Sequence, residues 1–358
     1  LSVGSQEKSS TSEGSFEVSD TSLKTMLTAS SMEFSTSSDS LNSDAGITSD
    51  TGSGTGSDTG TGNSIAINAV VDENQNSIEV SIEKAWTPYF AKFLPASVTN
   101  LKVVARAQVM GTGKICVIGL MESSLFAGIH LDQSASLSAP ECGVYSNSTS
   151  FASVRADANS QITAELICAA GGYWAQDSSS FTPAPTTDCP TIPDPLSDRP
   201  APSVGSCVAM ELAIDEDTTL TPGTYCGGIS ITGTSKVTLQ PGVYVIKDGP
   251  LTVADEASIS GEHVGFYLTG AGSVFSFAAD TSISLGAPSD GPLAGLLVME
   301  DANVNDMRVH QIRSNDARKL LGTIYLPKSI LQIAANAPVA DQSAYTAIVT
   351  MRLWLQEG

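Results

Sequence analysis

The stretch "LTPGTYCGGISITGTSKVTLQPGVYVIKDGP" spans residues 220–250 and contains one phrase written twice. The four residues of the first copy return 19 positions later: Leu220, Pro222, Gly223 and Tyr225 become Leu239, Pro241, Gly242 and Tyr244. Proline fixes φ and glycine permits an unusual backbone at each corner, while Val, Ile, Leu and Tyr of the short strands point inward. Because one coil of about twenty residues cannot bury its inward side chains alone, it must stack on the next coil. The stretch therefore predicts a parallel β-solenoid (β-helix), with Tyr225 stacked near Tyr244.

The composition favours a mostly-β protein with little affinity for polyanions. The 358 residues hold 17 Lys and Arg against 38 Asp and Glu, a formal charge of −21. Such a field repels phosphate backbones and anionic lipid headgroups, so we expect no nucleic-acid partner. Only 15% of the residues are charged and 6% are aromatic, while Gly, Ser, Thr and Ala abound. This composition suits short strands joined by tight turns.

Six cysteines indicate disulfides and an oxidising compartment, since their number is even and no CxxC pair or neighbouring histidine completes a zinc site. Half-buried thiols are the alternative. Among fifteen possible connectivities we expect Cys207 with Cys226 first, followed by Cys116 with Cys142 and Cys168 with Cys189. Acidic charge and paired cysteines together predict a periplasmic or extracellular protein. No apolar run is long enough to cross a bilayer and the start resembles no signal peptide, so we expect any export signal or membrane anchor to have been removed.

The chain divides by composition and period into five segments. The segments are a Ser/Thr/Gly/Asp-rich flexible segment at 1–63 with one short helix near 23–34, a small sheet region at 64–112, the first solenoid coils at 113–175, a Pro-rich excursion at 176–206, and the C-terminal coils at 207–358. The sheet region is expected to be α+β, with three alternating strands whose apolar face is covered by Trp86, Tyr89, Phe90 and Phe93. We expect the excursion to be extended and tied down by Cys189 and Cys207.

No residue pattern indicates catalysis, a cofactor or a metal. His130, His263 and His310 are far apart in sequence and are expected at the surface or in turns. The carboxylates considered for glycan cleavage are Glu300, Asp301, Asp306, Asp255 and Glu256. Among these, Glu300 and Asp301 end an apolar strand, where both side chains are expected to turn outward. A working pair needs one carboxyl that keeps its proton near neutral pH and one that stays ionised.

Residues 219–349 are similar to the C-terminal part of the TadE/TadG-like family of proteins, which are encoded with tight-adherence (Flp-type) pilus systems. The matching phrases include "LTPGTYCGGISI", "LQPGVYVIKDGPLTV", "GFYLTGAGSVFSF", "GPLAGLLVMED", "HQIRSNDARKLLGTIYLP" and "PVADQSAYTAIV". Looser similarity in "ARAQVMGTGKICVIGL", "ECGVYSNST" and "ICAAGGY" extends the match to about 64–350. The resemblance implies a membrane-anchored, periplasm-facing or surface-exposed accessory of pilus assembly, and carries over no catalytic residue. The family's N-terminal transmembrane helix and its Ala-rich sequel do not appear in this sequence.

Three classes of function therefore stay open. The first is a non-enzymatic envelope or surface accessory of a tight-adherence pilus, a rigid rod whose partners are other pilus or envelope proteins or a surface. The second is a secreted adhesin or an ice- or glycan-binding solenoid, since ice-binding solenoids carry a similar LxPGxY phrase; Thr232, Thr234 and Thr238 are not repeated in register in the next coils of the sequence. The third is a β-helix polysaccharide hydrolase or lyase. The sequence names neither the partner nor the oligomeric state.

Overall fold

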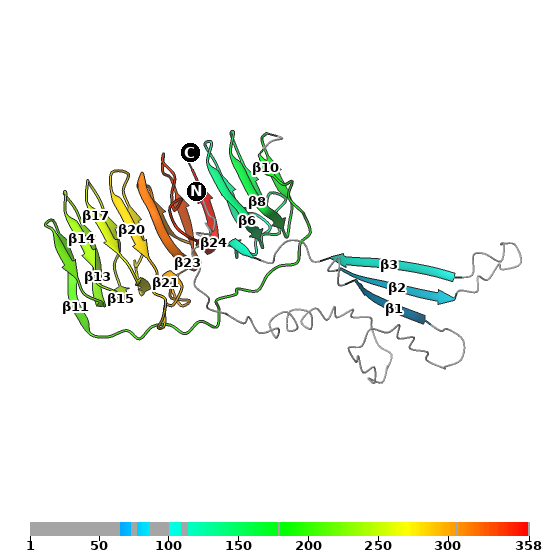
Figure 1. Ribbon diagram of the computed structural model, residues 1–358, viewed down its shortest axis with the longest axis horizontal. Coiled ribbons are helices and arrows are strands. Elements are labelled where there is room, and N and C mark those ends of the chain that lie inside the picture. Colours follow the sequence, from blue (N-terminus) through cyan, green and yellow to red (C-terminus); the bar gives the residue numbers. More distant parts are fainter. Residues whose placement is uncertain are drawn as a thin grey trace, which may run out of the picture. The chain divides into compact units, whose positions relative to one another are not determined.

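The computed structural model describes residues 65–72, 77–85, 100–108, 114–177, 180–305 and 307–356. These ranges hold 24 strands, β1 to β24, and no helix, and the chain separates into two compact units (Figure 1). The short helix expected near 23–34 lies outside the described residues, as do Trp86, Tyr89, Phe90 and Phe93.

The smaller unit contains a three-stranded antiparallel sheet. Its strands are β1 (Ile65–Asp72), β2 (Ser77–Ala85) and β3 (Asn100–Gln108), with β2 in the centre. Ile82 lies opposite a residue of β1 and opposite Val103 of β3. This sheet fits the expected alternation of period two, and it leaves Ile82 42% and Val103 65% exposed.

The larger unit is a parallel β-solenoid, as the repeated phrase predicts. Its strands are β4 (Ile115–Gly119), β5 (Ile129–Leu131), β6 (Ser136–Ser146), β7 (Val154–Ala156), β8 (Gln161–Ala169), β9 (Tyr173–Ala175), β10 (Phe181–Thr182), β11 (Cys207–Ile214), β12 (Thr218–Leu220), β13 (Gly223–Ile231), β14 (Lys236–Leu239), β15 (Gly242–Lys247), β16 (Leu251–Val253), β17 (Ser258–Gly261), β18 (Val264–Thr269), β19 (Phe275–Phe277), β20 (Ser282–Gly286), β21 (Leu296–Glu300), β22 (Arg308–Ile312), β23 (Asp316–Ile333) and β24 (Thr346–Leu355).

The two copies of the repeated phrase lie one coil apart. Leu220 pairs with Leu239 in parallel strands, and the rings of Tyr225 and Tyr244 stack with centroids 6.1 Å apart and planes 15° apart. The corner of the second copy explains its glycine: Gly242 has φ 141°, and a Cβ there would lie 2.4 Å from the ring of Pro222. Successive Pro-Gly corners therefore stack directly, which only glycine permits.

The core is a set of columns in which each inward side chain packs on its equivalent in the next coil. One such column consists of Tyr244, Phe266, Val298, Ile324, Ile348, Val117, Val144 and Ile167, all buried. Each such side chain contributes about 1.5–3 kcal/mol by leaving water. Burial of this kind depends on stacking, so no coil is stable alone.

The spatial order of the coils differs from their order in the sequence. The last strand, β24, pairs in parallel with β4 and β5 of the first coil, at Ile348 with Val117 and at Leu353 with Ile129. The coils of β4 to β10 thus continue the solenoid beyond the coil of β24, and β11 begins the solenoid at its other end (Figure 1). The segment between β10 and β11 must therefore return along the whole length of the solenoid.

That return segment, residues 183–206, is named here the strap. It begins beside the disulfide Cys168–Cys189 and ends beside the disulfide Cys207–Cys226, which matches the expectation that cysteines tie it down. The remaining disulfide joins Cys116 and Cys142, so all three expected pairs are present. Figure 1 shows the strap in green, passing along the coils from β10 to β11.

The strap covers an apolar column that points out of the solenoid. This outer column consists of Val245, Tyr267, Met299, Tyr325, Val349, Ile118, Tyr145 and Cys168, and each member is 8% exposed or less. Leu196 and Ile192 of the strap pack against it. Asp194 accepts a hydrogen bond from the hydroxyl of Tyr325 at 2.7 Å, and Arg199 donates to the carbonyl of Ala294 at 2.7 Å. One of the three solenoid faces, the strap face, is thereby closed to solvent.

Candidate functional site

Glu300, the first carboxylate considered from the sequence, is fully buried. It is the last residue of β21, and Asp301 follows it at the surface of the same corner. Glu300 Oε1 accepts hydrogen bonds from Arg308 Nη2 at 2.7 Å and from Ser329 Oγ, and Oε2 accepts from the amide of Lys328 at 3.0 Å. The expectation that both side chains turn outward is wrong for Glu300, because β22 of the same coil and β23 of the next coil bring donors around its carboxylate.

His310 completes this cluster and is also fully buried, contrary to the expectation of a surface or turn position. Its Nδ1 accepts from the amide of Phe275 at 3.2 Å, so its Nε2, 3.3 Å from Glu300 Oε1, carries the proton that it donates to the carboxylate. Burial lowers the pKa of His310 and keeps the ring neutral. Burial acts to raise the pKa of Glu300, but hydrogen bonds from His310, Ser329 and Arg308 outweigh it and the pKa is lowered.

Asp301 does not supply the other half of an acid–base pair. Burial acts to raise its pKa, but hydrogen bonds from Thr269 and Asn303 hold the pKa below its ordinary value. Both carboxylates are therefore ionised near neutral pH, and the pair lacks the split of pKa values that glycan cleavage needs. Asp255, Glu256 and His263 lie exposed in turns between strands, and Asp306 lies outside the described residues.

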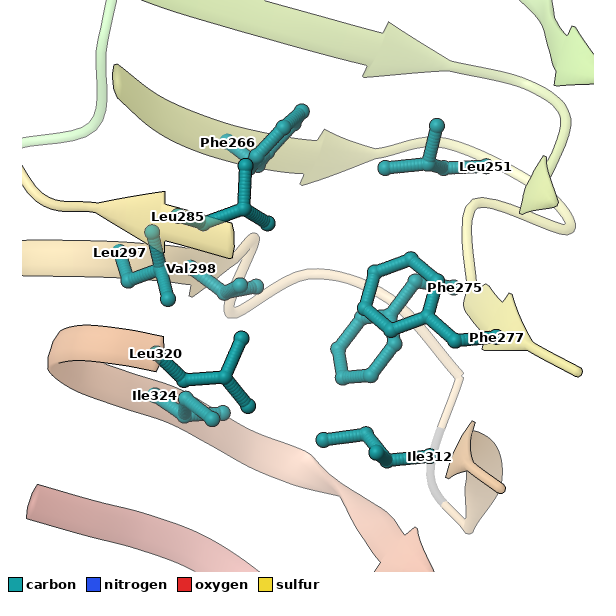
Figure 2. Close-up of a pocket in the computed structure, with 10 residues that line it drawn as sticks. All are labelled: Leu251, Phe266, Phe275, Phe277, Leu285, Leu297, Val298, Ile312, Leu320 and Ile324. Atoms are coloured by element: carbon teal, nitrogen blue, oxygen red, sulfur yellow. The ribbon is translucent and has the colours of Figure 1, made fainter. Parts of the chain in front are cut away.

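The interior holds a small apolar cavity between successive coils. Figure 2 shows side chains of several coils converging on it, including Phe266, Phe275, Phe277 and Ile312. Its space is about 10 Å³, the lower limit for one water molecule, and its lining is apolar. This cavity is a packing gap in the core and offers a substrate no polar group.

A second solenoid face, the open face, consists of ten strands in an unbroken parallel ladder. These strands are β11, β13, β16, β19, β22, β23, β24, β5, β7 and β9. Its central outward row reads Ala213, Ser230, Thr252, Ser276, Gln311, Gln332, Trp354, His130, Arg155 and Trp174. Every member of this row is at least partly exposed. The first six rungs are small or carry amides, and the last four are aromatic or cationic.

The aromatic and cationic end of the row, together with two flanking residues, is named here the Trp–Arg patch. It consists of Trp354, His130, Arg155, Trp174, Arg352 and Asp157. The ring of Trp354 lies parallel to that of His130, with centroids 6.1 Å apart and planes 1° apart. The guanidinium of Arg155 lies 5.0 Å from the centre of the Trp174 ring, and that of Arg352 lies 5.7 Å from the Trp354 ring. Each tryptophan of the solenoid thus carries an arginine at its face.

A continuous chain of polar contacts runs through the patch. Arg352 Nη2 lies 3.3 Å from His130 Nδ1, and His130 Nε2 lies 2.9 Å from Asp157 Oδ2. Since arginine only donates, His130 accepts at Nδ1 and donates its Nε2 proton to Asp157. Arg155 Nε also donates to Asp157, at 2.9 Å and 3.0 Å to the two oxygens. The patch thus holds two guanidiniums and one carboxylate, Asp157, to which Arg155 and His130 bond directly, and it has a net positive charge.

Two hydrogen-bond donors in the patch lack an acceptor. Arg352 Nε and Trp354 Nε1 are buried and bond to no described residue, and Arg352 forms no ion pair within the described ranges. Burial lowers the pKa of Arg352, and so does the neighbouring Arg155. Buried donors almost always have partners, so these two donors leave the patch incompletely satisfied among the described residues.

The third face carries hydroxyl columns that bear on the ice-binding alternative. Thr219, Thr238, Ser260 and Ser284 are in register on four successive coils, so the preceding coil carries a threonine beside Thr238 and the next coils do not, as expected. Serine replaces threonine after two coils, and Thr232 and Thr234 lie in a turn. This face is also discontinuous, since the strands β12 to β23 on it do not pair with β6 to β10.

Sequence reasoning missed both the buried cluster and the patch. His130, Arg155 and Trp174 lie about 200 residues from Arg352 and Trp354, and only the pairing of β24 with β5 brings them together. One signal existed. Trp354 stands in a short strand-like phrase, "MRLWL", two residues after Arg352. That signal names candidates without placing them on one face.

Comparison with protein-family models, with curated proteins and with solved structures gives no match. In the described part of the chain, no helix has the length and apolar character needed to cross a bilayer, and no three His, Cys, Asp or Glu residues gather as a metal site. Three disulfides indicate an oxidising, extracytoplasmic environment. The fold is compatible with an interaction or attachment module.

Proposed function

We propose that the protein is a non-enzymatic attachment module of the bacterial envelope or surface, serving a tight-adherence pilus system. The sequence phrases shared with the TadE/TadG-like family support the pilus context. The extracytoplasmic environment indicated by the disulfides agrees with it. In this proposal the periplasmic or surface-exposed solenoid is a rigid rod, and its partners are pilus or envelope proteins or a surface.

The observation that carries this proposal is the contrast between two faces of the solenoid. The strap closes one face over a buried apolar column, whereas the open face presents ten strands without a cover among the described residues. A continuous sheet surface of this length, in a solenoid with three disulfides, holds its side chains in fixed positions. It can therefore bind a partner at little cost in conformational entropy. The burial of Glu300 and the donors that occupy both of its carboxylate oxygens support contact rather than cleavage as the mode of action.

Site-specific photo-crosslinking in cells with an intact tight-adherence system tests the proposal. A photoreactive residue at Thr252, on the open face, is expected to crosslink to a pilus-assembly or envelope protein. The same residue at Thr238, an equally short side chain on the third face, is the matched control and is expected to give no such product. Loss of the gene is expected to reduce surface adherence; unchanged adherence, together with no product from Thr252, contradicts the proposal.

A further inference from the structure

We propose that the Trp–Arg patch binds an acidic polysaccharide, with a uronate carboxylate held by the two guanidiniums and sugar rings packed against the aromatic residues. This inference rests on the proposed attachment function and names the chemistry of the surface to which the module attaches. It is carried by the patch alone, because the other six rungs of the open face bear no charge.

The charge of the patch selects an anion. The patch holds two guanidiniums, those of Arg155 and Arg352, and one carboxylate, Asp157, which bonds to Arg155; the side chain of Arg155 is 43% exposed. Arg352 stacks on Trp354 and approaches His130 Nδ1, but its Nε bonds to no described residue. A ligand carboxylate beside Arg352 would compensate the charge of its guanidinium.

The aromatic side chains select a sugar rather than a small anion. Tyr173 and Trp174 are 44% and 37% exposed, on the outermost strand of the open face. The ring of Trp354, which is partly exposed, provides a second aromatic surface in the patch. Aromatic rings with an apolar body and a polar edge are suited to pyranose rings, which also have apolar and polar surfaces.

The length of the patch selects an oligomer. Trp354 and Trp174 are three strand steps apart, which is about 14 Å at the usual spacing of about 4.8 Å between neighbouring strands. A single sugar does not span this distance. A short run of uronates reaches both tryptophans and passes Arg155 between them.

The overall acidity of the chain does not forbid this ligand. The formal charge of −21 is spread over 358 residues, and at 0.15 M ionic strength charges farther than about 8 Å from the ligand are largely screened. The close contacts of Arg155 and Arg352 then decide the interaction.

The test is binding of the purified full chain to oligogalacturonate at 0.15 M salt, measured by calorimetry and by tryptophan fluorescence. Two further probes are the methyl-esterified oligomer, which keeps the sugar and loses the charge, and sodium acetate, which keeps the carboxylate alone. We expect saturable binding of the acidic oligomer only. Arg155→Gln is expected to weaken it about tenfold or more, and Trp174→Ala about fivefold.

Two controls separate the patch from general charge and from folding. Lys236→Gln removes an exposed cation from the third face, and Thr252→Ala alters an uncharged rung of the open face. Both are expected to bind as the parent does. Arg155→Lys keeps the charge without the planar guanidinium and is expected to bind between the parent and Arg155→Gln. Thermal unfolding of each variant confirms that the solenoid is intact.

Equal binding of the esterified oligomer, equal binding by the Arg155 and Trp174 variants, or no binding of the acidic oligomer overturns the inference. If the oligomer does not bind while photo-crosslinking from position 252 succeeds, the ligand class is wrong and attachment stands. If the oligomer binds through the patch while position 252 gives no crosslinked product and loss of the gene leaves adherence unchanged, the pilus context fails and the ligand assignment stands.

Discussion

Replacing Glu300 by glutamine is expected to destabilise the solenoid strongly, although the two side chains have nearly the same shape. Glu300 is fully buried and uses both carboxylate oxygens as acceptors for Arg308, Ser329, His310 and the Lys328 amide. Glutamine supplies one acceptor oxygen and turns an N–H toward donors. Arg308 is 12% exposed and would lose its counter-charge.

Removing one partner of a buried ion pair costs about 3–5 kcal/mol. For a unit of this size each kcal/mol shifts the unfolding midpoint by about 2–4 °C, so we expect a loss of about 10 °C at pH 7. Glu262→Gln is the matched control, because Glu262 pairs with Lys319 at the surface with its side chain 55% exposed. Such a surface pair is worth about 1 kcal/mol or less.

The pH dependence follows from the lowered pKa of Glu300 in the folded protein. The stability that its ionised form contributes is fully present above the unfolded pKa of about 4.3, and is lost as pH falls through the lower folded pKa. The difference in midpoint between the parent and Glu300→Gln is therefore expected to shrink below about pH 4. A midpoint shift under about 2 °C at pH 7, or a difference that stays constant down to pH 3, would refute this reasoning.

Three further changes test other parts of the structure. Cys168→Ala with Cys189→Ala frees the start of the strap and is expected to cost about 3 kcal/mol and to raise binding of a hydrophobic dye, whereas unchanged dye binding contradicts the covering role of the strap. Phe266→Ala opens a hole in the inner column that begins at Tyr244 and is expected to cost about 3–5 kcal/mol in urea unfolding; a loss below about 1 kcal/mol would show that the column is not packed. Because burial lowers the folded pKa of His310, the unfolded chain binds more protons below its own pKa of about 6.5, so stability is expected to fall from pH 7 to pH 5, and a flat profile in this window counts against a neutral buried His310.

The solenoid itself is predictable from the sequence because the Pro-Gly corners and the inward Tyr recur at a constant spacing. Tyr225 and Tyr244 stack as the spacing requires, and the three disulfides join the expected cysteines. The stacked tyrosines depend on residues close in sequence, where local geometry decides the result. The disulfides were expected from the even number of cysteines.

The order of the coils is not predictable in this way, because the Pro-rich stretch shows that the chain leaves the solenoid without showing where it returns. Any coil edge offers the same parallel hydrogen-bond pattern, so the pairing of β24 with β4 depends on the fit of whole columns such as Ile348 on Val117. The burial of Glu300 has the same origin. Its partners Arg308, His310 and Ser329 come from β22 and β23, and a strand-ending carboxylate in the sequence does not announce them.

The coil order is the central claim, because it alone brings Arg155 and Trp174 beside Trp354 on the open face. Pulsed electron paramagnetic resonance between spin labels on the outward row measures it directly. Arg155 is four strand steps from Gln311 and seven from Ser230, which predicts backbone separations of about 19 Å and about 34 Å.

Coils stacked in simple sequence order would place β9 next to β11 and reverse these distances. Arg155 would then lie about 14 Å from Ser230 and about 29 Å from Gln311. The labelled pair 155 and 311 is therefore expected to be the closer of the two. A shorter distance for the pair 155 and 230 would contradict the coil order and, with it, the existence of the patch.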